Sequence, residues 1–155
     1  MFDVPADAAW VWLGLLVGSA AMFGAIADLS AVPPNAERVA ETVDEVRAVD
    51  YTAEASVPVE ASEAKIGQSS VALRGPGGTA HATFERGTVT PVRPGSSLSD
   101  VLHGQPPGAV FPKPGTFRRA VVAARSNPPE WHETGDAIRI RRIRYGEVDC
   151  VLVGT

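Results

Sequence analysis

The sequence predicts an α+β protein: an N-terminal transmembrane helix, a second amphipathic helix, and a small antiparallel β-sheet domain with two short helices. Three observations predict it: an uncharged apolar run near the N-terminus, a helical stripe of apolar residues after it, and short alternating segments separated by glycine and proline. We expect the anchor at residues 1–30, the helix and a linker at 31–64, and the soluble α+β domain at 65–155.

The anchor prediction rests on the segment between Asp7 and Asp28, which contains no charged residue. Its length of roughly 20 residues matches the bilayer core. Trp10 and Trp12 lie near its start, where indole rings favour the headgroup region. A cleaved signal peptide is the alternative, because Ala25-Ile26-Ala27 has the small-x-small form of a cleavage site. The first seven residues contain no Lys or Arg, which favours a retained anchor.

Small residues fall on one face of the predicted anchor: Gly14, Gly18, Ala21 and Ala25. Small residues at helical spacing let two helices approach closely in lipid. We therefore predict that this face associates with other membrane proteins and that the remaining surface contacts membrane lipid. The alternative is a chance stripe in an Ala-rich segment.

The second helix is predicted to follow Pro33-Pro34, with Asn35 as its N-cap and its end near Asp50. Its apolar stripe consists of Val39, Ala40, Val43 and Val46. The stretch from Tyr51 to Ala64 contains Pro58 and many small or acidic residues, so we expect an extended linker there.

Short strands are predicted next. Val71 and Leu73 occupy alternate positions, and Ala80, Ala82 and Phe84 alternate with polar residues; this pattern predicts a β-meander with one buried face. Two short helices should follow: one begins at the capping box Ser97–Asp100 and ends at Gly104, and one is capped by Thr116 and stopped by Asn127-Pro128-Pro129.

The last segment predicts a hairpin around Gly146-Glu147. This turn pairs Tyr145 with Val148, Arg144 with Asp149, and Ile143 with Cys150. The alternation slips by one position at Arg141-Arg142, which predicts a β-bulge there.

Composition narrows the function. The formal net charge is −4, which argues against a nucleic-acid partner. Lys65 and Lys113 are the only lysines, a bias typical of salt-loving archaea or of a GC-rich genome. The single cysteine, Cys150, excludes an intramolecular disulfide.

No catalytic, metal or cofactor motif is recognisable, and no small-molecule substrate is indicated. Gly75–Thr79 lacks the Gly-Lys-Ser/Thr ending of a phosphate-binding loop, and His81, His103 and His132 lack metal-ligand spacing. One basic cluster is a possible partner-binding patch: Arg139, Arg141, Arg142 and Arg144. It could bind an acidic protein, or the arginines could pair with Glu147 and Asp149 on the return strand, which we favour.

Several segments resemble a family of short single-pass haloarchaeal membrane proteins. They are Met1–Pro5, Trp10–Leu15, Leu73–Thr79, Val89–Pro91 and Gly146–Gly154. Genes of that family accompany type IV pilus-like secretion genes, and its members have no assigned activity. The resemblance implies a minor or pseudo-pilin-like role, although Asp3 and Asp7 stand where archaeal prepilins carry a basic leader.

These observations predict a non-enzymatic, membrane-anchored component of a type IV pilus-like or secretion assembly. The predicted location is the cell membrane, with the soluble domain outside the cytoplasm. The alternative is a membrane-tethered cytoplasmic adaptor that recruits a soluble protein, and a third reading is a tethered enzyme that uses the histidine loops.

Overall fold

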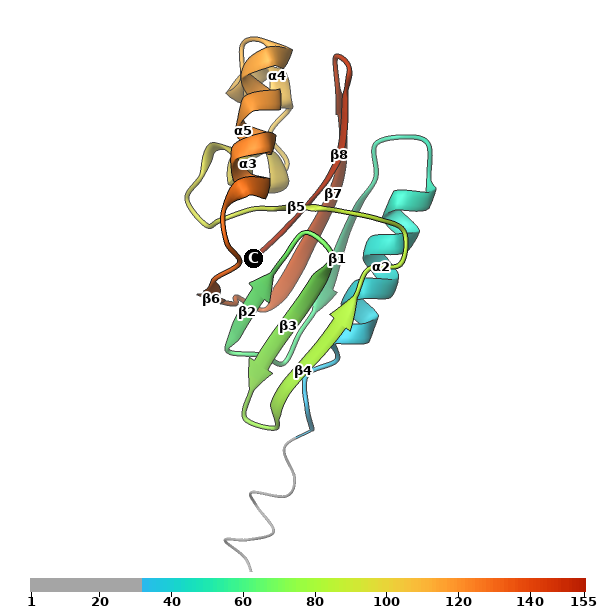
Figure 1. The fold of residues 1–155 in the computed structure, drawn as a ribbon, viewed down its shortest axis with the longest axis vertical. Helices are drawn as coiled ribbons and strands as arrows, with labels where there is room; N and C mark the ends of the chain where they lie inside the picture. Colours follow the sequence, from blue (N-terminus) through green and yellow to red (C-terminus); the bar gives the residue numbers. More distant parts are fainter. Residues whose placement is uncertain (1–31) are drawn as a thin grey trace, which may run out of the picture. The chain divides into compact units, whose positions relative to one another are not determined.

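The computed structural model describes residues 32–155, which contain helices on both sides of paired strands (Figure 1). The helices are α2 (Ala36–Ala48), α3 (Ser97–Leu102), α4 (Pro107–Val110) and α5 (Pro114–Ser126). The strands are β1 (Glu54–Pro58), β2 (Glu63–Ile66), β3 (Ser70–Gly75), β4 (Gly78–Thr83), β5 (Thr90–Pro91), β6 (Trp131–Glu133), β7 (Ala137–Tyr145) and β8 (Val148–Gly154). They form two four-stranded sheets, with strand orders β1-β7-β8-β5 and β4-β3-β2-β6.

The β7–β8 hairpin is the centre of the first sheet. Its register confirms the predicted pairs Tyr145–Val148, Arg144–Asp149 and Ile143–Cys150. Gly146 in the turn has a φ of 61°, a backbone conformation that glycine adopts without steric cost. The turn chemistry therefore fixes the pairing of these two strands.

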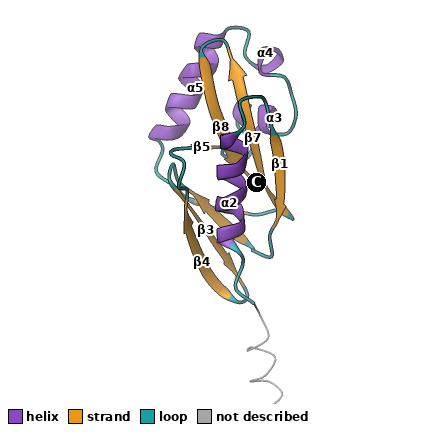
Figure 2. Ribbon diagram, turned by 90° about the vertical axis from the view of Figure 1, so that its right-hand side faces the viewer, coloured by secondary structure: helices purple, strands orange, loops and turns teal. Residues whose placement is uncertain are grey.

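Two hydrophobic cores lie on opposite faces of this hairpin. Ile138, Ile140, Val151 and Val153 belong to a core that also contains the apolar stripe of α2 and the inner face of the second sheet. Ile143, Cys150 and Leu152 belong to a core shared with α3 and α5. Figure 2 shows α2 and α5 at separate places along the strands. The β7–β8 pair is therefore covered on both faces.

The register shows that the predicted β-bulge at Arg141-Arg142 is wrong. Pairing between β7 and β8 runs without interruption from Arg139–Gly154 to Tyr145–Val148. Both faces of β7 are buried, each against a different core. Ile140 faces the first core and Ile143 faces the second, so the apolar residues shift by one position along the strand. A regular strand that lies between two cores thus produces the same sequence pattern as a bulge.

The α2 helix confirms the sequence prediction in detail. Its stripe of Val39, Ala40, Val43 and Val46 is buried, and the Asn35 side chain accepts a hydrogen bond of 3.0 Å from the Arg38 backbone N–H. This bond satisfies one of the N–H groups that a helix start leaves without a partner.

Asn35→Ala should therefore lower the free energy of unfolding by about 1 kcal/mol. Urea denaturation followed by circular dichroism measures this loss. Asn35→Asp retains a capping oxygen and is the matched control. Equal losses in both variants would contradict a capping role.

The predicted fold class requires a correction. The α+β architecture is confirmed, but no helix within residues 32–155 combines the length and the apolar character needed to cross a membrane. The predicted N-terminal transmembrane helix, and with it the description as a single-pass protein, is therefore not supported. The predicted anchor at residues 1–30 and its face of Gly14, Gly18, Ala21 and Ala25 lie outside the described residues.

The predicted linker between Tyr51 and Ala64 is also wrong, because β1 and the first half of β2 lie there. Only Val57 is buried in β1, which pairs with β7 alone and forms one edge of its sheet. An edge strand with one buried residue has too weak an alternation to distinguish it from an extended loop.

Three further elements differ from the prediction. The second of the predicted short helices is α5, which has 13 residues and begins at Pro114 rather than after Thr116. α3 has Ser96 as its N-cap, without the expected side-chain capping bond. β5 pairs in parallel with β8, so the first sheet is not purely antiparallel.

Candidate functional site

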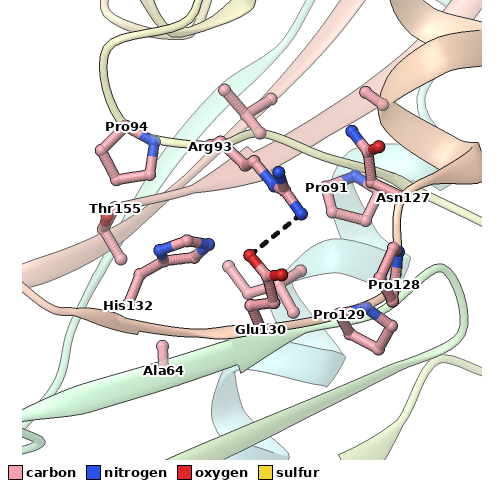
Figure 3. A pocket seen from close by; sticks show the side chains of 13 residues that line it. Ala64, Pro91, Arg93, Pro94, Asn127, Pro128, Pro129, Glu130, His132 and Thr155 are labelled. Carbon is pink, nitrogen blue, oxygen red and sulfur yellow. Dashed lines mark ion pairs between the residues drawn. The ribbon is translucent and has the colours of Figure 1, made fainter.

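A small pocket lies between β2, the segment after β5 and the loop that follows α5 (Figure 3). Arg93 forms an ion pair of 3.0 Å with Glu130, and His132 lies beside this pair. The cavity volume is about 30 Å³. This volume has room for about one water molecule, which is too small for a substrate or an organic cofactor.

The histidines do not meet at this pocket or elsewhere in the described part of the chain. His132 lines the pocket, His81 lies on β4, and His103 follows α3, where its Nδ1 lies 2.8 Å from the Ser99 carbonyl oxygen. Residues 32–155 contain no group of three or more His, Cys, Asp and Glu side chains that could hold a metal ion.

The four arginines of the predicted patch do not share one surface. Successive strand residues point to opposite faces of a sheet, so Arg139 and Arg141 lie on one face of β7 and Arg142 and Arg144 on the other. Arg139 and Arg144 are exposed, whereas Arg141 and Arg142 are half-buried. The two half-buried side chains bind within the domain.

Arg142 forms the strongest charged contact of the four. Its Nε and Nη2 donate to the two carboxylate oxygens of Asp149 at 3.0 and 2.8 Å, and its Nη1 donates to the Arg47 carbonyl oxygen at 2.8 Å. Arg144 also donates to Asp149, at 3.1 Å. The bonds from Arg142, with that from Arg144, lower the pKa of Asp149 from 3.8 to about 2. The favoured prediction of pairing across the hairpin is thus correct for Asp149.

Arg141 connects the sheet to α3. Its guanidinium donates to the carbonyl oxygens of Val101 and Gln105, and its Nε lies 3.7 Å from a Glu54 carboxylate oxygen. Carbonyl groups at a helix C-terminus lack intrahelical hydrogen-bond donors, and a cationic side chain can donate to them. This contact fixes the end of α3 against β7.

An aromatic residue that sequence reasoning did not single out lies on the second sheet. Lys65 and Arg74 lie over the Trp131 ring, with their charged groups 5.0 and 4.1 Å from its centroid. Arg74 also forms a 3.0 Å ion pair with Glu63. Both cations contact the Trp131 ring, and these cation–π contacts stabilise the edge of the sheet.

An acidic groove lies between α2 and β4, with a cavity volume of about 670 Å³. We call it the α2–β4 groove. Five carboxylates and two basic side chains line it: Glu37, Glu41, Asp44, Glu45, Glu85, His81 and Arg86. At one end, Asp44 accepts hydrogen bonds from the backbone N–H groups of Glu85 and Arg86, at 3.0 and 2.9 Å.

Sequence reasoning identified the acidic face of α2 but missed this groove. The missing information was the neighbour of α2, since β4 begins 30 residues after the helix ends (78 − 48). A sequence signal existed only in the lack of Lys, Arg and Pro within Gly78–Thr83, which leaves a strand edge unprotected.

Comparison with protein families gives one match, to a family of unknown function, DUF7283, over residues 3–143. The chain belongs to this family. Comparisons of this DUF7283 member with curated proteins and with solved structures found no match. The resemblance is thus supported as far as a family of unknown function, and its haloarchaeal and pilus associations stay predictions.

The cysteine of this DUF7283 member is buried. Cys150 lies in the second core with 4% of its surface exposed, and burial raises the pKa of its thiol to about 11. Because the thiolate is the reactive form, labelling by a maleimide at pH 8 should be about 100-fold slower in the folded protein than in urea. Mass spectrometry of the time course measures both rates, and similar rates would contradict burial.

Proposed function

We propose that this protein is a non-enzymatic component of a pilus-like or secretion assembly, which acts by binding other proteins through residues 32–155. The observation that supports it is the α2–β4 groove, where an open strand edge lies beside a helix. Strand edges beside a helix are a recurrent peptide-binding arrangement. The assembly itself is inferred from the resemblance to haloarchaeal proteins of pilus-like gene clusters.

The proposed location is the cell membrane, with residues 32–155 outside the cytoplasm. Its support is the resemblance to the haloarchaeal membrane proteins. Cell fractionation tests the location directly: the full chain should be recovered with membranes and should resist extraction by high salt. Recovery in the salt-extracted fraction would overturn it.

The function is tested by purifying the tagged full chain from its native cells and identifying the proteins that accompany it. Pilus-like or secretion proteins should be enriched relative to an equally abundant tagged membrane protein. Purification without any of them would refute the proposed assembly. Residual partners of another class would favour the second candidate.

The second candidate is a cytoplasmic adaptor that recruits a soluble protein. Arg38 and Arg47 follow the uncharged run, and basic residues beside such a run favour a cytoplasmic domain. Labelling of Ser62→Cys in intact cells distinguishes the two, because Ser62 is exposed and the native Cys150 is buried. Labelling supports the external location, and protection that disappears on lysis supports the adaptor.

A further inference from the structure

We propose that the α2–β4 groove binds an extended, Lys- and Arg-rich segment of a partner protein, which adds to the free edge of β4 as a further strand. This inference rests on the proposed function, since it names the partner chemistry of that surface. Figures 1 and 2 both place α2 beside β4.

The free edge of β4 offers unpaired backbone groups. β4 pairs only with β3 among the described strands, and the hydrogen bond from Phe84 N to the Ser69 carbonyl sets which residues face β3. Hydrogen-bonded pairs alternate along an antiparallel ladder, so Ala80 and Ala82 bond to β3. The backbone N–H and C=O groups of Thr79, His81 and Thr83 therefore point to the free edge.

The groove runs along this edge. Its lining includes both His81 and Ala82, whose side chains point to opposite faces of the sheet. With Thr83 they are three successive β4 residues in the lining, so the groove follows the strand there. An added strand would lie about 4.8 Å from β4.

β4 is the longest of the four outer strands and the one whose edge is least protected by its sequence. β5 has two residues and β6 has three, which is too short for a stable addition. β1 has five residues but ends in Pro58, which cannot donate a backbone hydrogen bond. β4 has six residues and contains neither proline nor lysine, the usual protections of an exposed edge.

The charge of the groove selects a basic partner. Asp44 is engaged by two backbone N–H groups, but Glu37, Glu41, Glu45 and Glu85 form no ion pair with any described residue. Arg86 is the one arginine of the lining, which contains no lysine. Carboxylates without partners favour association with a cationic segment and repel an acidic one.

The same charge disfavours two other occupants. A second copy pairing through its own β4 would bring two acidic walls together, in a protein of net charge −4. An anionic lipid headgroup would meet the same carboxylates. The occupant is therefore a basic peptide segment.

The test measures binding of fluorescent seven-residue peptides to the full chain by fluorescence anisotropy. One peptide alternates Lys and Thr, and its counterpart alternates Glu and Thr. We expect the Lys peptide to bind at least about tenfold more tightly, with affinity falling as salt is raised. Equal binding of the two peptides overturns the proposal.

Two variants locate the binding. His81→Pro removes one edge N–H without removing a bond to β3, and Glu37→Gln, Glu41→Gln and Glu45→Gln together remove wall charge. Each should weaken Lys-peptide binding about tenfold or more, whereas Glu147→Gln on the β7–β8 turn should leave it within about twofold. Unchanged binding in the triple variant overturns the proposal even if His81→Pro fails to fold.

Two other results separate this inference from the proposed function. A dimer seen by analytical ultracentrifugation, and lost in His81→Pro, would assign the edge to a second copy and overturn the proposal. Co-purification of pilus-like proteins without Lys-peptide binding would refute the groove while leaving the proposed function intact. Peptide binding without those proteins would refute the assembly and leave the groove.

Discussion

Phe117→Ala should lower the free energy of unfolding by about 3–5 kcal/mol. Phe117 is fully buried, and its ring makes edge-to-face contacts with Phe111 and Tyr145, at centroid distances of 5.4 and 5.9 Å. Only Phe117 and Val121 are buried on α5, so this ring supplies most of the helix's attachment to the second core. This loss is a large fraction of the free energy of unfolding of a typical domain, which is roughly 5–15 kcal/mol.

Thermal and urea unfolding of the purified chain, followed by circular dichroism, measure this loss. Val122→Ala lies on the same helix but its residue is 56% exposed, and it should change stability by less than about 0.5 kcal/mol. Comparable effects of the two substitutions would show that the core around Phe117 does not have the described packing.

Arg142→Ala should cost about 2 kcal/mol, because it removes two charge-assisted bonds to Asp149 and one bond to the Arg47 carbonyl. The Arg142 side chain is 13% exposed, so water replaces these bonds poorly. Arg144→Ala removes a single bond from a side chain that is 56% exposed, and it should cost less than about 1 kcal/mol. Losses of the same size in the two variants would contradict this assignment.

The same contact predicts a pH dependence of stability. The pKa of Asp149 is about 2 in the folded protein and 3.8 without its partners, so the folded state favours the carboxylate. Its contribution is fully present above about pH 4 and is lost as the pH falls towards 2. Because Asp149 is 35% exposed, we expect about 1 kcal/mol, reduced by solvent screening.

Urea midpoints between pH 2 and pH 5 measure this dependence. The decline on the acid side should be smaller in Arg142→Ala than in the native chain. An identical decline would assign the acid sensitivity to other carboxylates.

Local signals predicted the elements whose structure depends on neighbouring residues. Asn35 and the stripe from Val39 to Val46 specified α2, and Gly146 specified the register of β7 and β8. Each signal acts over a few residues, because particular residue types favour helix caps and tight turns. These parts of the fold were predictable from the sequence.

Long-range pairing was not predictable in the same way. β1 pairs with β7 in the register Glu54–Arg141, and β5 pairs in parallel with β8, although neither strand has a distinctive pattern. Because β7 is regular and lacks the predicted bulge, Arg141 and Arg142 point to opposite faces of the sheet, which separates the predicted patch. The α2–β4 groove depends on a contact between distant segments and left only an indirect trace in the sequence.

The β7–β8 hairpin serves both cores at once, since Ile140 and Ile143 pack on opposite sides of one strand. Separation of the hairpin removes buried residues from both cores, so we expect the unfolding of the two cores to be coupled. Residues 32–155 should consequently behave as a single cooperative unit, in which a tightly held ligand at α2 also slows hydrogen exchange in α5.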